Sequence, residues 1–161
     1  VLQRAILFSG KIADNLRQGK KNASSEDMKR AAEISQAAEF INRYEDGFDH
    51  LVEERSSNLS GGQKQRLSIA RTLSKGSEVI LFDEATSALD NNSQDYIKKT
   101  IDNLVNDHTI VIVAHRLSTI MDADIIHVVD GGKVIATGTH KELLNSCKIY
   151  RNLYETESLN S

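Results

Sequence analysis

The spacing of apolar residues changes near residue 76 of the chain. Before that point apolar side chains recur at helical intervals, as at Ala31, Ile34 and Ala38, so residues 10–75 are predicted to be mostly helical. After it come three short, nearly unbroken apolar runs rich in Val and Ile, "EVILFD", "TIVIVAH" and "IIHVVD". Such runs are typical of strands that are buried on both faces of a parallel sheet.

The stretch between the first two runs, "NNSQDYIKKTIDNLVND", predicts an amphipathic helix. Its residues Ile97, Ile101, Leu104 and Val105 fall on one helical stripe. A strand, a helix and a second strand in this order form a βαβ unit, in which the two strands pair in parallel. The sequence therefore predicts an α/β fold with a helical half followed by a half that contains the sheet.

Turn and capping residues add detail to this layout. The stretch "VVDGGKVIATG" predicts a β-hairpin that turns at Gly131 and Gly132. Ser24, which has an acid three residues later, and Thr139 are predicted to cap the starts of two helices.

Composition narrows the class of protein. The 161 residues carry a net charge of −3, which gives no indication of a nucleic-acid partner, because nucleic-acid-binding surfaces are strongly basic. No apolar run approaches the roughly 20 residues that span a bilayer. The lone cysteine, Cys147, cannot form a disulfide within the chain.

The stretch "LSGGQ" has the features of an anion-binding helix start. Ser60 suits the N-cap position, and Gly61 and Gly62 would allow a large anion to approach the backbone N–H groups. A Ser-Gly-Gly turn taken alone more often only starts a helix, so this motif depends on its neighbours.

The ends of two predicted strands carry candidate catalytic groups. Asp83 and Glu84 follow the run "VILF", where a carboxylate could hold Mg²⁺ and a second could deprotonate an attacking water. His115 ends the next strand and would lie at the same edge of a parallel sheet, where it could donate a hydrogen bond to a terminal phosphate. Solvent-facing acids and a surface histidine are the alternative interpretation of these residues.

These motifs, in this order, closely resemble the nucleotide-binding domain of ABC transporters of the exporter type. "LSGGQ" (59–63) resembles the ABC signature, and "VILFDEATSALD" (79–90) resembles the Walker B strand running into the D-loop. "TIVIVAHR" resembles the switch-histidine region, and "VLQRAILFSGKIADNL" resembles the Q-loop stretch. The resemblance implies a P-loop NTPase-type (RecA-like), mainly parallel sheet, incomplete in this chain. Residues 1–75 would form the Q-loop and α-helical signature subdomain, and residues 76–161 the C-terminal part of the ATPase core.

The resemblance also implies a role for each motif residue, with ATP and Mg²⁺ as cofactors. Gln3 would contact Mg²⁺ or the attacking water, and Asp83 would hold Mg²⁺ through water. Glu84 would be the general base, and His115 would hold the γ-phosphate.

A second nucleotide-binding domain, in a homodimer or a heterodimer, would complete each site. Asp90 would belong to the D-loop, which crosses the dimer interface. The γ-phosphate of ATP on the opposite cassette would be contacted by four signature residues: Ser60, Gly61, Gly62 and Gln63. Together with a transmembrane domain, the cassette would drive export from the cytoplasmic face of the membrane.

Two stretches depart from the family pattern. In "VEERSSN", Glu53 and Ser56 stand where the family commonly has glycine, around Glu54, which matches the acid that contacts the membrane domain. The phosphate-binding loop, G-x-x-x-x-G-K-[ST], fits none of the three Gly-Lys pairs, at residues 10–11, 19–20 and 132–133. The expectation is that the chain is the C-terminal part of a cassette and inactive alone; a truncated gene product or a proteolytic remnant would give the same sequence.

The sequence is also compatible with two other functions. A non-transport ABC ATPase of DNA repair or chromosome maintenance would carry a long coiled coil between the Q-loop and the signature, whereas here one short helical segment separates Gln3 from Ser60. A non-enzymatic fragment would only pair with a complete cassette.

Overall fold

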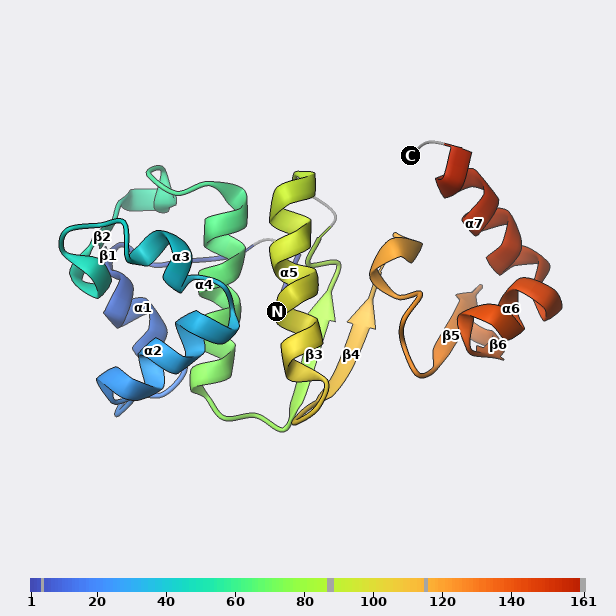
Figure 1. Cartoon of the computed structure of the whole chain (residues 1–161), viewed down its shortest axis with the longest axis horizontal. Helices are drawn as coiled ribbons and strands as arrows, with labels where there is room; N and C mark the ends of the chain where they lie inside the picture. Colours follow the sequence, from blue (N-terminus) through green and yellow to red (C-terminus); the bar gives the residue numbers. More distant parts are fainter. Residues whose placement is uncertain (4, 87–88, 115, 160–161) are drawn as a thin grey trace. The chain divides into compact units, whose positions relative to one another are not determined.

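The computed structural model describes residues 1–3, 5–86, 89–114 and 116–159, which form two compact units (Figure 1). Unit 1 is Val1–Val113 and unit 2 is Ala114–Ser161. This boundary, between residues 113 and 114, separates packed bodies. The predicted division at residue 75 separates a helical part from a sheet part, and it stays a prediction.

Unit 1 contains the predicted helical half and the first two predicted strands. Its elements, in chain order, are β1 (Gly10–Lys11), α1 (Ile12–Arg17), α2 (Ser25–Ile34), α3 (Ala38–Ile41), η1 (Gly47–Asp49), β2 (Leu51–Val52), η2 (Glu54–Ser56), α4 (Gly61–Ser74), β3 (Val79–Asp83), α5 (Asn91–Leu104) and β4 (Thr109–Val113). The prediction of a mostly helical stretch before residue 76 is confirmed, with the short antiparallel pair of β1 and β2 added to it.

Helices α1, α2 and α4 enclose the first hydrophobic core. Leu16 of α1, Ala32 of α2 and Leu67 of α4 are fully buried in it. Between α2 and α3 the backbone of Gln36 takes a left-handed conformation, with φ of 59°. The apolar stripe predicted across Ala31, Ile34 and Ala38 is therefore divided between two helices.

Strands β3 and β4 pair in parallel, as the βαβ pattern predicted. The register runs from Val79 opposite Thr109 to Asp83 opposite Val113. Helix α5 covers one face of the pair (Figure 1). Its residues Ile97, Ile101 and Leu104 pack with β3 in a second core, with Ile80 and Phe82. Val105, predicted on the same stripe, is 53% exposed.

The other face of the β3–β4 pair is exposed, which differs from the predicted burial on both faces. Four side chains on it are 46–59% exposed: Val79, Leu81, Val111 and Val113. The apolar run predicted a sheet covered on both sides, and within unit 1 the described residues cover only the side on which α5 lies.

Unit 2 contains a hairpin and two helices. Its elements are η3 (Leu117–Thr119), β5 (Ile126–Asp130), β6 (Lys133–Gly138), α6 (His140–Ser146) and α7 (Lys148–Leu159). The predicted hairpin is confirmed: β5 and β6 pair antiparallel, and Gly131 and Gly132 have φ of 53° and 75°, as a tight I′-type turn requires. The third apolar run is thus an antiparallel strand among the described residues, not a parallel one.

No helix in the described part of the chain is both long enough and apolar enough to cross a membrane.

In the described part of the chain, side-chain caps begin four helices. Ser24 and Thr139 form capping boxes with Asp27 and Glu142, as predicted. Asp90 caps α5 by accepting from the Ser93 N–H at 2.9 Å. The carboxylates of these caps accept hydrogen bonds from backbone N–H groups, and these bonds are the main cause of their lowered pKa values. The N–H of Ser24 lowers the pKa of Asp27, that of Ser93 lowers the pKa of Asp90, and that of Thr139 lowers the pKa of Glu142.

These lowered pKa values predict a loss of stability in acid. Each cap contributes fully above the unfolded-state pKa, near 4, and its contribution is lost as pH falls through the lower folded-state pKa. Replacing all three by Asp27→Asn, Asp90→Asn and Glu142→Gln keeps an oxygen acceptor but removes the titration. We expect the free energy of unfolding, measured with urea, to fall less between pH 6 and pH 3 in this variant than in the parent. An equal fall in both proteins would contradict the prediction.

Candidate functional site

The N-terminal segment lies along β3 and brings Gln3 to the end of that strand. The Val1 nitrogen donates to the Leu81 carbonyl at 2.7 Å, and the Asp83 N–H donates to the Val1 carbonyl at 2.9 Å. Gln3 then donates from Nε2 to Oε2 of Glu84 at 3.0 Å. Two predicted site residues, 81 positions apart in the sequence, are therefore in direct contact.

The backbone at Glu84 is held in an unusual conformation. Its φ is 49°, in the left-handed region that residues other than glycine rarely adopt. The Glu84 N–H donates to the Val113 carbonyl on β4 at 2.8 Å. Conformations of this kind persist where the surroundings impose them, and they are concentrated at functional sites.

His115 lies outside the described residues, so its predicted place beside Asp83 stays a prediction. The strand pairing on which that prediction relied is confirmed, because Asp83 and Val113 are register partners at the same end of the parallel pair.

The signature turn starts α4 through a capping box, as predicted for Ser60. The Gln63 N–H donates to Ser60 Oγ at 3.2 Å, and the Ser60 N–H donates to Gln63 Oε1 at 2.8 Å. Ser60 and Gly61 are exposed, but Gly62 is buried.

Gly62 is buried because the start of α5 packs against it. A Cβ atom at Gly62 would lie 2.1 Å from Ser93 Oγ and 2.7 Å from Ser93 Cβ. Ser93 in turn donates from Oγ to Asp90 Oδ2 at 2.9 Å. Because glycine has no side chain, the turn that begins α4 can pack against the Asp90 cap of α5 within one chain.

Sequence reasoning missed Gln65, which links the signature helix to the N-terminal segment. Its buried side chain donates from Nε2 to the carbonyl of Leu2, next to Gln3, at 3.0 Å. A signal for it existed: Gln65 lies one helical turn before the apolar Ile69, and a polar side chain on an apolar stripe needs a buried partner.

Oxygen atoms suited to Mg²⁺ lie at the end of β3. The Asp83 carboxylate and the Gln3 amide oxygen are hard ligands of the kind that Mg²⁺ prefers. Among the described residues, no three His, Cys, Asp or Glu side chains gather as a metal cluster. Mg²⁺ in phosphate sites usually takes only one or two protein ligands, so this donor set fits it.

Comparison with known proteins identifies the family. The family model for ABC transporters matches residues 2–87, more than half of the chain. This chain belongs to the ABC transporter family. The match includes every predicted site residue before the D-loop aspartate.

Several ABC proteins are similar over almost the whole chain. ABC transporter B family member 1 of Dictyostelium discoideum is 44% identical over 158 residues, which are 98% of this chain and 17% of that protein. The mitochondrial ATP-binding cassette sub-family B member 10 of Mus musculus is 45% identical over 162 residues, covering 98% of this chain and 23% of that protein. A bacterial Atm1-family ABC exporter with ATP bound matches with a TM-score of 0.88 and 40% identity, over 97% of this chain and 28% of its own.

These matches confirm the resemblance to an exporter-type nucleotide-binding domain and the P-loop NTPase-type α/β fold. The chain spans less than a third of the length of each of these three proteins. The roles of the individual site residues stay predictions.

The contact at Gly62 predicts that alanine is not tolerated there. Gly62→Ala should lower the free energy of unfolding by about 1–3 kcal/mol, because the new methyl group overlaps Ser93. Gly61→Ala is the matched control, since its Cβ would meet only Leu89 Cδ2, at an ordinary 3.7 Å. Ser93→Gly should restore part of the loss. Equal stability of the two alanine variants in urea denaturation would show that the close approach does not exist.

Proposed function

We propose that this chain is part of the ATP-binding and ATP-hydrolysing cassette of an ABC exporter, which dimerises around ATP to drive export across a membrane. The observation that carries the proposal is the hydrogen bond between Gln3 and Glu84 at the end of β3. It joins the proposed Q-loop glutamine to the proposed general base in a chain of the ABC transporter family.

Each residue at the end of β3 has a separate role in ATP hydrolysis. Glu84 accepts the proton of the water that attacks the γ-phosphate, and Gln3 holds the Glu84 carboxylate and orients that water. Asp83 would hold Mg²⁺ through water, and the bound ion would supply positive charge beside the phosphates. His115 donates a hydrogen bond to the γ-phosphate.

A second cassette completes each ATP site. Ser60, Gly61 and Gln63 contact the γ-phosphate of ATP held by the opposite chain, with Gly62 setting the close packing behind them. Asp90 lies at the same interface. The other partner is a transmembrane domain, so the site of action is the cytoplasmic face of the membrane.

Residues 1–161 contain no G-x-x-x-x-G-K-[ST] loop. We propose that this loop comes from another segment or chain. This chain and the segment that carries the loop together form the complete cassette.

The structure gives no support to a coiled-coil ATPase of DNA repair. Among the described residues between Gln3 and Ser60, the longest helix is α2, with 10 residues.

Glu84→Gln tests the proposed general base. In the complete cassette, this variant should lower the rate of ATP hydrolysis by about 10²–10⁴-fold, because the amide cannot accept a proton from water. ATP binding should persist, since Asp83 is unchanged. The measurements are phosphate release and nucleotide affinity.

Glu78→Gln is the control, because Glu78 is an exposed acid that immediately precedes the opposite end of β3. It should hydrolyse ATP at the parent rate. Parent-like hydrolysis by Glu84→Gln would remove Glu84 from the role of base.

The chain of residues 1–161 alone should bind ATP weakly and hydrolyse none. The loop's backbone N–H groups and lysine supply most phosphate contacts in this class of site. Phosphate release by the purified chain that disappears in Glu84→Gln would show that the phosphate site has been misplaced. A chain that only pairs with a complete cassette and never supports turnover there would instead favour a non-enzymatic role.

A further inference from the structure

Arg66 is a buried cation on the signature helix that no proposed catalytic step uses. It lies on α4, three residues after Gln63, and only 7% of its side chain is exposed. Burying a guanidinium is costly unless it is paired, and an apolar side chain of similar size is often at least as stable in such a place. The position of Arg66 therefore calls for an explanation in terms of geometry.

The polar contacts of Arg66 hold the turn between α2 and α3. Its Nη1 donates to the Gln36 carbonyl at 2.8 Å and to Glu39 Oε2 at 3.1 Å. Gln36 is the residue with φ of 59° at the C-terminal end of α2, where a cation also interacts favourably with the helix dipole.

Two aromatic rings lie against the Arg66 guanidinium. Its Cζ is 4.9 Å from the centre of the Phe40 ring on α3 and 4.2 Å from the centre of the Tyr96 ring on α5. Both distances are within the range of a cation–π interaction. One side chain of α4 thereby contacts both α3 and α5.

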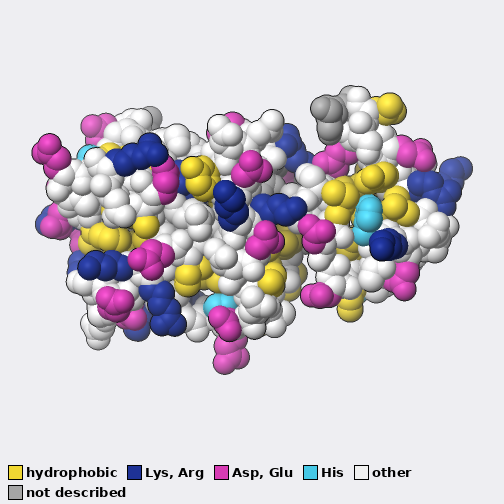
Figure 2. Space-filling model, in the orientation of Figure 1, with side chains coloured by type: hydrophobic (Ala, Val, Ile, Leu, Met, Phe, Trp, Pro, Cys, Tyr) yellow, Lys and Arg dark blue, Asp and Glu magenta, His cyan; other side chains and the backbone are white. Residues whose placement is uncertain are grey.

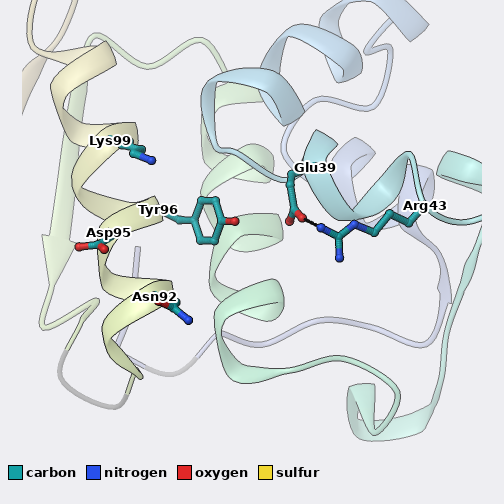
Figure 3. Close-up of a pocket in the computed structure, with 6 residues that line it drawn as sticks. All are labelled: Glu39, Arg43, Asn92, Asp95, Tyr96 and Lys99. Carbon is teal, nitrogen blue, oxygen red and sulfur yellow. Dashed lines mark hydrogen bonds and ion pairs between the residues drawn. The ribbon is translucent and has the colours of Figure 1, made fainter.

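Beyond this contact, α3 and α5 are separated by a polar hollow. Figure 3 shows the Tyr96 ring extending from α5 toward Glu39. The hollow is lined by Glu39, Arg43, Asn92, Asp95, Tyr96 and Lys99. Charged and polar groups therefore face each other across the hollow, and Arg66 contacts an aromatic ring of each helix beside it.

The Tyr96 contact continues the packing that begins at Gly62. Gly62 and Arg66 are one turn apart on α4, and Ser93 and Tyr96 are one turn apart on α5. The close approach of Gly62 to Ser93 and the stacking of Arg66 on Tyr96 are thus successive contacts along one helix pair.

We propose that Arg66 is a positioning residue that sets α4 against α5. It thereby fixes the spacing between the Ser60–Gln63 turn, which begins α4, and Asp90, which caps α5. This inference rests on the proposed function, in which both of these elements meet ATP and the opposite cassette. Arginine suits the task because its planar fork binds Gln36 and Glu39 while its faces contact the rings, which the single ammonium group of lysine cannot do.

Arg66→Lys tests this role in the complete cassette. We expect kcat for ATP hydrolysis to fall roughly 10-fold or more, because misplacement of about 1 Å in a catalytic assembly can cost as much as 100-fold. The KM for ATP should change less than about twofold, because the signature turn engages ATP only when two cassettes close. In a Glu84→Gln background, the same substitution should lower the fraction of the cassette that forms dimers at saturating ATP, measured by size-exclusion chromatography.

Arg43→Lys is the matched control. Arg43 also pairs with Glu39, but its side chain is 73% exposed, and the cation–π contacts of the described residues to Phe40 and Tyr96 come from Arg66 and Lys99. It should keep the parent kcat and KM, since exposed ion pairs contribute little.

Tyr96 variants keep the proposal testable if Arg66→Lys fails to fold. Tyr96→Phe keeps the ring and should retain the parent kcat, whereas Tyr96→Leu should lower kcat as Arg66→Lys does. The double variant should lose little more than either single one, because both changes break one contact.

Two results would overturn the inference: Arg66→Lys that hydrolyses ATP like Arg43→Lys, or Tyr96→Leu that matches Tyr96→Phe. A failure of the proposed function gives a different result. In that case Glu84→Gln retains hydrolysis, whatever the Arg66 and Tyr96 variants do.

Discussion

The placement of α4 is the constraint on which unit 1 depends. This helix belongs to both hydrophobic cores of the unit: Leu67 is buried with α1 and α2, and Ile69 is buried with β3 and α5. Its first residues form the proposed signature turn, and its Gln65 holds the backbone beside Gln3. A shift of α4 would therefore move the signature turn, the Q-loop segment and the cover of β3 together.

Burial around most of its circumference explains why α4 carries specific polar contacts. A buried polar side chain is costly unless it is hydrogen-bonded, so each one must meet a partner on a neighbouring element. Gln65 meets the N-terminal segment, and Arg66 meets the α2–α3 turn and the Tyr96 ring. In a helix with a fully apolar stripe, these directions would be set by shape alone. Here, hydrogen bonds also fix the position of α4 along its neighbouring elements, which apolar side chains of the same volume would not do.

The sequence predicted those features that depend on a single element or on one repeating pattern. The caps at Ser24, Ser60 and Thr139, the parallel pairing of β3 with β4 and the hairpin all follow from residue type and spacing. Contacts between distant segments could not be predicted in this way. The packing of Gly62 on Ser93 and the stacking of Arg66 on Tyr96 depend on how two helices lie against each other. The exposed face of β3–β4 escaped prediction for a related reason, since an apolar run shows that a strand can be covered but not what covers it.

The strained backbone at Glu84 shows how strand β4 and the N-terminal segment, which lie on either side of β3, act on the candidate base. A left-handed residue other than glycine costs about 1–3 kcal/mol and persists only where its neighbours impose it. Here, hydrogen bonds hold the turn from both sides: the Asp83 N–H donates to Val1, and the Glu84 N–H donates to Val113. Val1 precedes Gln3 by two residues, and Val113 precedes His115 by two. The backbone of the candidate base is thus fixed by the same two segments whose next residues are proposed to contact the attacking water and the γ-phosphate. The two segments that fix the backbone of Glu84 therefore also carry Gln3 and His115, the residues proposed to act beside it.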